Sequence, residues 1–293
     1  MSVLIIGGYG FVGSSLLSLL EKDDSIKYII VIDNNVAARI AVRSKKIRSY
    51  NIGINETDYF RDIVKNYNIT HILNLSASHK LNNINYLVDL KRILDICIEC
   101  NVQHFHHTYC DATVAYADEL LITENTQLAK NNTHSFLHSS ILELVLAYYN
   151  HGINTSGSIA CNLYGQNQPL TQFISKSISS IKNNDKITIY GDGSHLRNWL
   201  HVDDYSRALI AILNSSEIKG ETLVISSNHD VSNIEVADMI CKNLKVPLQT
   251  HVRHIDGSIQ IDPYKKLYRS YKRSNLINWT QNVDIDSGIK SLC

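Results

Sequence analysis

A glycine-rich turn between an apolar run and an amphipathic stretch constrains this chain more than any other feature. The run Val3–Ile6 predicts a buried strand, and the residues from Ser14 to Leu20 predict a helix. Between them, Gly7, Gly10 and Gly13 follow the spacing G-x-x-G-x-x-G. The first glycine allows a tight turn, the second lets backbone approach a phosphate, and the third lets helix and strand pack closely. Because the helix N-terminus offers unpaired N–H groups and the positive end of its dipole, the pattern predicts a pyrophosphate-binding turn.

An acidic residue at the end of a second apolar run indicates which dinucleotide the turn binds. Asp33 follows the run Tyr28–Ile32, twenty residues after the last glycine of the turn. A carboxylate at that distance can hydrogen-bond the hydroxyls of an adenosine ribose. Asn34 and Asn35 come next, so no arginine or lysine directly follows to bind a 2′-phosphate. We therefore expect the cofactor to be NAD and not NADP.

Strands and helices alternate through the first half of the chain. This rhythm predicts right-handed β-α-β units and an α/β fold, a doubly wound parallel sheet of the Rossmann type. The rhythm changes near residue 163, so we expect a Rossmann domain over 1–162 and a smaller C-terminal α/β lobe over 163–293, with some chain crossing back to the sheet. The expected strands are 3–6, 28–32, 47–52, 71–75, 103–108 and 153–161, and the expected helices are 11–20, 59–67, 84–100 and 135–149.

The overall composition argues against several kinds of partner. Lys and Arg total 28 and balance 28 Asp and Glu, so the chain carries no net charge that would favour nucleic acid or a membrane surface. No apolar run reaches the ~18 residues that span a bilayer. The chain goes from Met1 straight into a strand without a signal-peptide pattern, and its six cysteines are scattered. We therefore expect a cytoplasmic protein with reduced thiols.

Three segments resemble the extended short-chain dehydrogenase/reductase family, in its NAD-dependent branch of nucleotide-sugar epimerases and dTDP-glucose 4,6-dehydratases. They are the turn 6–13, the segment Asn162-Leu163-Tyr164-Gly165, and the pair Ile189-Tyr190-Gly191-Asp192-Gly193 and Arg197-Asn198-Trp199-Leu200-His201-Val202-Asp203-Asp204. The last pair is similar to the family's IYGDG and RDWLxVxD motifs. The resemblance covers essentially the full length and implies a nucleoside-diphosphate sugar bound by the second lobe.

The resemblance also implies roles for individual residues. Asn162 would contact the sugar or its diphosphate, and Arg197 would clamp the phosphates, although a surface ion pair of Arg197 with Asp192 or Asp203 is the simpler alternative. Asp203 and Asp204 are expected to cap the following helix, and His201 to be a loop or surface residue. The implied cofactor-binding set is Gly7, Gly10, Phe11, Val12, Gly13, Asp33, Asn34, Leu75, Ser76, Ala77, His138 and Leu163.

The catalytic residues of the family are replaced. The family uses a Ser or Thr after its fifth strand and a Tyr-x-x-x-Lys motif in the next long helix, and no such motif occurs between residues 110 and 160. The alignment places Cys110 at the Ser/Thr position and Asp111 at the acidic position of the dehydratases, with Ala112 in place of their Glu. It places His134 at Tyr and His138 at Lys. The four-residue spacing survives, so both histidines should emerge on one helix face toward the cofactor.

Four interpretations of this set remain open. In the first, His134 accepts the proton of a sugar hydroxyl and the protein oxidises or epimerises a nucleoside-diphosphate hexose, with 4,6-dehydration disfavoured by Ala112. In the second, the chain is a catalytically silent relative that binds NAD, a nucleotide sugar or both as a sensor or assembly partner. The third is a metal site of the two histidines and Cys110, and the fourth is a Cys110 nucleophile with His134 as its base. We favour the first, narrowly over the second, and expect no metal.

The chain is also expected to form a homodimer. Many relatives pair through the helices after the fourth and fifth strands, here 84–100 and 135–149. The second of these is apolar on more than one face, so it needs burial on two sides.

Overall fold

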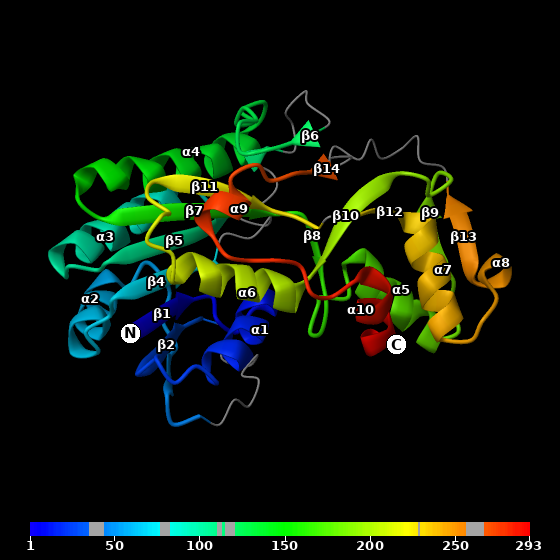
Figure 1. Ribbon diagram of the computed structural model, residues 1–293, viewed down its shortest axis with the longest axis horizontal. Coiled ribbons are helices and arrows are strands. Elements are labelled where there is room, and N and C mark those ends of the chain that lie inside the picture. Colours follow the sequence, from blue (N-terminus) through cyan, green and yellow to red (C-terminus); the bar gives the residue numbers. More distant parts are fainter. Residues whose placement is uncertain (35–43, 77–82, 110–112, 115–120, 228, 256–266) are drawn as a thin grey trace.

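A seven-stranded parallel sheet forms the centre of the larger lobe (Figure 1). The computed structural model describes residues 1–34, 44–76, 83–109, 113–114, 121–227, 229–255 and 267–293. The strand order is β11-β7-β5-β4-β1-β2-β3, and every neighbouring pair is parallel. The strands are β1 (Ser2–Ile6), β2 (Tyr28–Ile32), β3 (Ile47–Tyr50), β4 (His71–Asn74), β5 (His104–Tyr109), β7 (Asn154–Ala160) and β11 (Glu221–Ile225).

Helices cover both faces of this sheet, which confirms the doubly wound architecture. On one side α1 (Phe11–Leu20) packs against α6 (Val202–Leu213), and on the other α3 (Asn85–Glu99) packs between α2 (Thr57–Asn66) and α4 (Thr133–Ala147) (Figure 1). β1 and β2 lie between the two helical layers and are nearly continuous apolar runs. β5 and β7 instead carry buried histidine and serine side chains.

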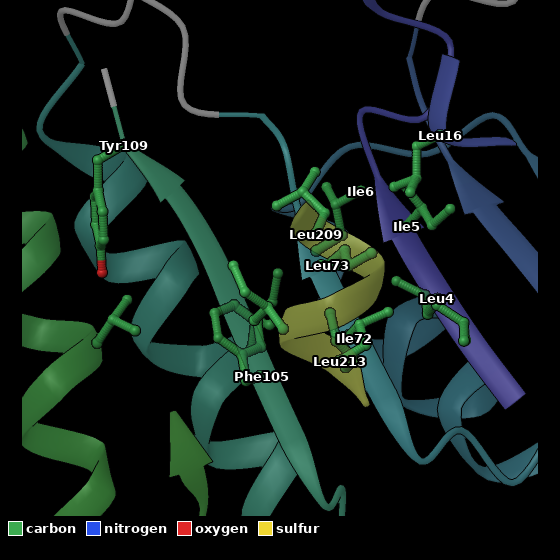
Figure 2. Close-up of a cluster of buried hydrophobic side chains, with 14 of the residues drawn as sticks. Leu4, Ile5, Ile6, Leu16, Ile72, Leu73, Phe105, Tyr109, Leu209 and Leu213 are labelled. Atoms are coloured by element: carbon green, nitrogen blue, oxygen red, sulfur yellow. The ribbon is translucent and has the colours of Figure 1, made fainter. Parts of the chain in front are cut away.

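The contact between the sheet and α6 shows how this core is built. Leu209 and Leu213 of α6 belong to the same buried cluster as Ile5 and Leu73, which lie on the sheet face that α6 covers (Figure 2). Leu16 of α1, which covers the same side of the sheet as α6, lies beside Ile5 in the same figure. Burying a side chain of this size removes apolar surface worth about 1.5–3 kcal/mol.

The second lobe is built from small sheets and helices around its own buried cluster. One sheet has the order β12-β10-β8, and two pairs, β13-β9 and β14-β6, flank it. Tyr164, Trp199 and Ile240 are buried members of this cluster. The strands are β6 (Leu121–Ile122), β8 (Asn162–Tyr164), β9 (Ile187–Tyr190), β10 (Leu196–His201), β12 (Asp230–Ser232), β13 (Val252–Ile255) and β14 (Leu267–Tyr268). The helices are α5 (Phe173–Lys182), α7 (Asn233–Asn243), α8 (Leu248–His251), α9 (Arg273–Leu276) and α10 (Ile285–Leu292). In the larger lobe, a 3₁₀ turn, η3 (Tyr148–His151), follows α4.

Two expectations about the start of α6 are wrong. The N-cap is His201, whose Nδ1 accepts from the backbone N–H of Asp203 at 3.3 Å, and its side chain is buried, not exposed. Asp204 does not cap the helix. Its fully buried carboxylate accepts from the backbone N–H groups of Asn282 and Val283, both at 2.9 Å, and forms an ion pair with Arg207. Asp204 therefore fastens the C-terminal segment to the large lobe, a contact that helix periodicity cannot reveal.

A chain of buried polar groups crosses the core between the sheet and α6. His104 Nε2 and His106 Nδ1 both contact Ser156 Oγ, at 2.7 and 2.8 Å. His106 Nε2 contacts Ser158 Oγ at 2.9 Å, and Ser158 Oγ contacts the Tyr205 hydroxyl at 2.8 Å. Each member has a partner, as buried polar groups require.

Candidate cofactor and substrate site

The turn after β1 has the backbone geometry that a pyrophosphate site needs. Gly7 has φ +77°, a conformation that favours glycine, and its N–H donates to Ile32 O at 2.8 Å. A Cβ on Gly13 would lie 2.5 Å from the backbone of Gly8, so only glycine lets α1 approach the turn. Gly10 is the N-cap of α1, and no side-chain cap bond is found there, while Phe11 and Val12 open the helix. These residues fit an anionic dinucleotide at the N-terminus of α1.

Asp33 lies at the carboxyl end of β2, next to this turn. Its Oδ2 accepts from the backbone N–H of Tyr9 at 2.9 Å, so the carboxylate is oriented by the turn itself. Asn34, the next residue, is exposed. The structure thus brings together the turn and the acidic residue that the sequence placed twenty positions later, because β1 and β2 are parallel neighbours.

The carboxyl end of β4 carries a polar network beside the turn. Leu75 donates its N–H to Ile6 O at 2.9 Å, and its backbone would lie 3.3 Å from a Cβ on Gly7. Asn74 is fully buried, and its Oδ1 accepts from Ser76 Oγ at 2.6 Å. Its Nδ2 donates to the Tyr86 hydroxyl at 3.0 Å. Ala77, predicted to follow in this motif, lies outside the described residues.

This network continues to His107, a fully buried histidine on β5. His107 Nδ1 lies 2.8 Å from Thr108 O, and a carbonyl can only accept, so Nδ1 carries the proton. His107 Nε2 is then the acceptor for the Tyr86 hydroxyl at 3.3 Å. Burial lowers the pKa of His107 to about 3, so the ring is neutral. His106 and His107 lie on opposite faces of the sheet, as the alternation of a strand predicts.

The two histidines that the alignment places at the family's Tyr-x-x-x-Lys motif contact each other on α4. The Asn132 side chain caps this helix and accepts from the Ser135 N–H, which fixes the first turn. The rings of His134 and His138 are 4.6 Å apart between centroids, edge to face. His138 is fully buried and close enough to His107 to lower the pKa of that ring, whereas His134 is partly exposed. Cys110 and Asp111, the other predicted catalytic residues, lie outside the described residues, as does Ala112.

The predicted substrate residues lie on two neighbouring strands of the second lobe. Asn162 and Leu163 are on β8, where Asn162 pairs with Trp199 of β10, and Leu163 O accepts from Gln168 Nε2 at 2.7 Å. Arg197 lies two residues before Trp199 on β10 and is partly buried. The structure therefore brings Asn162 and Arg197 to one small sheet.

Within the described part of the chain, no three His, Cys, Asp or Glu side chains group as a metal site would require. None of the helices described there is long and apolar enough to cross a bilayer.

A family model described as the NAD dependent epimerase/dehydratase family matches residues 3–226. The chain belongs to this family. This finding confirms the recognition made from the sequence motifs and the prediction that the cofactor is NAD.

Two curated relatives are similar to this chain over most of their own length. The low-salt glycan biosynthesis protein Agl12 of Haloferax volcanii is 26% identical over 82% of this chain and 81% of its own. The dTDP-glucose 4,6-dehydratase of Haemophilus influenzae is 25% identical over 87% of this chain and 83% of its own.

Solved structures share the fold. The dTDP-glucose 4,6-dehydratase of Bacillus anthracis, solved with NAD, superposes with a TM-score of 0.87 at 22% identity, over 99% of this chain and 94% of that one. The UDP-glucuronic acid 4-epimerase of Bacillus cereus, solved with UDP-glucuronic acid and NAD, also reaches 0.87, at 18% identity, over 99% and 97%.

Asp33 provides a direct test of the cofactor site. Replacing Asp33 with alanine should weaken NAD binding about 10- to 100-fold, because a hydrogen bond to a charged group contributes about 1.5–3 kcal/mol. Isothermal titration calorimetry measures this change. Asp24→Ala removes an equal charge at an exposed position that pairs only at the surface with Lys46, and should leave the affinity unchanged. Undiminished NAD affinity in Asp33→Ala would exclude the assigned role.

Proposed function

We propose that the protein uses NAD to oxidise or epimerise the hexose of a nucleoside-diphosphate sugar, with His134 as the proton acceptor. The observation that carries this proposal is the contact between a partly exposed His134 and a fully buried His138 at the start of α4. An exposed imidazole can meet a substrate hydroxyl, and a buried neighbour can hold its ring in place. The two residues keep the spacing of the family's catalytic pair.

In this proposal the chain's own residues bind and orient the reactants. The glycine turn and the N-terminus of α1 bind the pyrophosphate, and Asp33 binds the adenosine ribose. When bound, NAD supplies a hydride acceptor. Arg197 offers a guanidinium fork that suits a diphosphate, and Asn162 offers an amide on the adjacent strand. A ring nitrogen of His134 then takes the hydroxyl proton as the sugar is oxidised.

The choice among reactions follows from the chain's departures from its relatives. Several relatives are dTDP-glucose 4,6-dehydratases, but Ala112 stands where those enzymes are expected to carry the Glu that assists elimination of water. We therefore propose oxidation or epimerisation and not 4,6-dehydration. Cys97, Cys100, Cys241 and Cys293 are free thiols, which supports a reducing compartment such as the cytoplasm.

The second candidate is a silent protein that binds NAD and a nucleotide sugar without turning it over. The replacement of Tyr, Lys and Ser/Thr together favours it, because relaxed selection on proton transfer would leave this pattern. The cofactor-binding residues of the glycine turn match the family pattern, whereas the catalytic residues do not.

One experiment separates the two candidates. The purified protein is loaded with NAD and mixed in turn with UDP-, dTDP- and GDP-linked hexoses, while the absorbance of reduced nicotinamide is followed and the sugars are analysed by mass spectrometry and NMR. A new absorbance band or an epimerised sugar with one substrate supports the enzyme. Bound NAD with unchanged sugars throughout supports the silent protein.

We also propose that the chain forms a homodimer through α3 and α4. Both helices carry exposed apolar side chains: Ile84, just before α3, is 58% exposed, Val88 on α3 is 50% exposed and Phe136 on α4 is 50% exposed. Such side chains on neighbouring helices favour a partner surface.

Phe136→Glu should convert the dimer to a monomer, because a charge would then be buried at the interface. Light scattering after size exclusion should give about twice 33.1 kDa for the parent and 33.1 kDa for the variant. Tyr59→Glu, at an exposed position of α2 outside the proposed interface, is the matched control and should remain dimeric. A monomeric parent chain would contradict the proposal.

A further inference from the structure

An aromatic side chain that the glycine pattern does not require lies at the adenosine end of the cofactor site. Tyr9 occupies the variable position between Gly8 and Gly10, and it is partly buried. Its backbone N–H donates to Asp33 Oδ2 at 2.9 Å. Its phenol hydroxyl forms a hydrogen bond with Ser49 Oγ on β3. One residue therefore contacts the ribose-binding carboxylate with its backbone and the next strand with its side chain.

The strand order determines where this side chain runs. Tyr9 follows β1, Ser49 lies on β3, and β2 lies between those two strands. Ser49 pairs with Val31, two residues before Asp33, and the Asp33 N–H donates to Tyr50 O at 3.2 Å. To reach Ser49, the Tyr9 side chain must therefore cross β2 close to Asp33. Its two ends are held by hydrogen bonds, so the ring cannot readily move aside.

NAD and NADP differ at the 2′-oxygen of the adenosine ribose, which binds next to Asp33 and Tyr9. A carboxylate that accepts hydrogen bonds from the ribose hydroxyls holds the 2′-oxygen within one hydrogen bond of itself. In NADP that oxygen carries a phosphate with a charge of nearly −2, which needs space and cationic donors beside it. Asp33 repels this charge, and the tethered ring of Tyr9 takes up space next to the carboxylate. We propose that Tyr9, held by Ser49, acts with Asp33 to select NAD against NADP.

The test compares the affinities of the protein for the two cofactors. NAD⁺ and NADP⁺ are titrated separately into the parent protein, Tyr9→Ala and Ser49→Ala by isothermal titration calorimetry. The parent should bind NAD⁺ at least ~100-fold more tightly than NADP⁺, and Tyr9→Ala should reduce this ratio at least ~10-fold, chiefly through tighter NADP⁺ binding. Ser49→Ala releases the phenol but keeps the ring, so it should reduce the ratio by a smaller factor, about threefold.

Two results would overturn the proposal. One is a parent protein that binds both cofactors equally. The other is a Tyr9→Ala variant in which both affinities change by the same factor, which would show that Tyr9 only supports the turn. Tyr59→Ala removes a tyrosine that is 65% exposed on α2 and should leave the ratio unchanged. If Tyr9→Ala does not fold, Ser49→Ala decides alone, and an unchanged ratio in that variant overturns the proposal.

Discussion

His134→Ala is expected to lower turnover of the nucleotide sugar by about 10²- to 10⁴-fold, the usual contribution of a positioned general base. The affinity for NAD should stay within about twofold, because the turn and Asp33 lie on other elements and alanine is a good residue for a helix. The measurement is kcat with the sugar identified by the substrate screen, together with NAD titration of the same preparation. The helix itself should persist, since its cap is formed by Asn132 and Ser135.

Added imidazole makes this test sharper. His134 is partly exposed, so free imidazole should enter the space left in His134→Ala and restore part of the turnover. His195→Ala removes an exposed histidine near the start of β10 and should retain full activity. Full turnover in His134→Ala would remove this residue from the mechanism, and a loss that imidazole does not restore would point to a structural role.

The second large effect is a loss of stability in mild acid. Burial lowers the pKa of His104 to about 4 and of His107 to about 3, and it lowers the pKa of His106 well below the ordinary value of 6.5. As the pH falls below 6.5, the unfolded chain binds protons at these histidines before the folded chain does. Stability is therefore constant above this pH and falls from about pH 6.5 down to the folded-state pKa values.

The expected size follows from three such groups. Between pH 7.5 and 5.5 each histidine should cost about 1.4 kcal/mol, so the free energy of unfolding should fall by about 4 kcal/mol. Urea unfolding at the two pH values measures it. Carboxylates titrate below this window, so histidines dominate the change.

A variant of one buried histidine provides the control. His104→Gln keeps a side-chain amide that can bond Ser156 but cannot titrate, so the pH-dependent loss should shrink by about one third. His195→Gln, at an exposed position, should leave the loss unchanged. If the free energy of unfolding of the parent falls by less than the ~1.4 kcal/mol expected of a single histidine, the calculation is contradicted.

Much of the large lobe could be predicted from local sequence patterns. The apolar runs 28–32 and 71–75 became β2 and β4, and the amphipathic stretch 11–20 became α1, with bounds that agree to within one residue. β2 and the centre of β4 are recognisable in the sequence because both faces of the sheet are buried there, so these residues are apolar. The glycine turn and Asp33 could be found for the same reason, since their spacing along the chain fixes their spacing across two parallel strands.

The second lobe and the polar contacts could not be predicted in this way. Its short strands, such as β8 and β12 of three residues each, are too short to show an alternation of apolar and polar residues. Asp204 looked like a helix cap from its position, but its partners lie near residue 282. A residue's local sequence does not report a partner 78 positions away.

The sequence by itself determined the fold class and the cofactor, because each depends on residue types at fixed short spacings; from the same kind of spacing it also predicts that the catalytic motif is replaced. Only the tertiary structure decided which polar groups meet. It placed His107 against Tyr86 and Asn74, joined Tyr9 to Ser49 across β2, and buried His138 while leaving His134 partly exposed. The physical reason is that a hydrogen bond in the core depends on which strands and helices become neighbours, and that follows from packing of the whole chain.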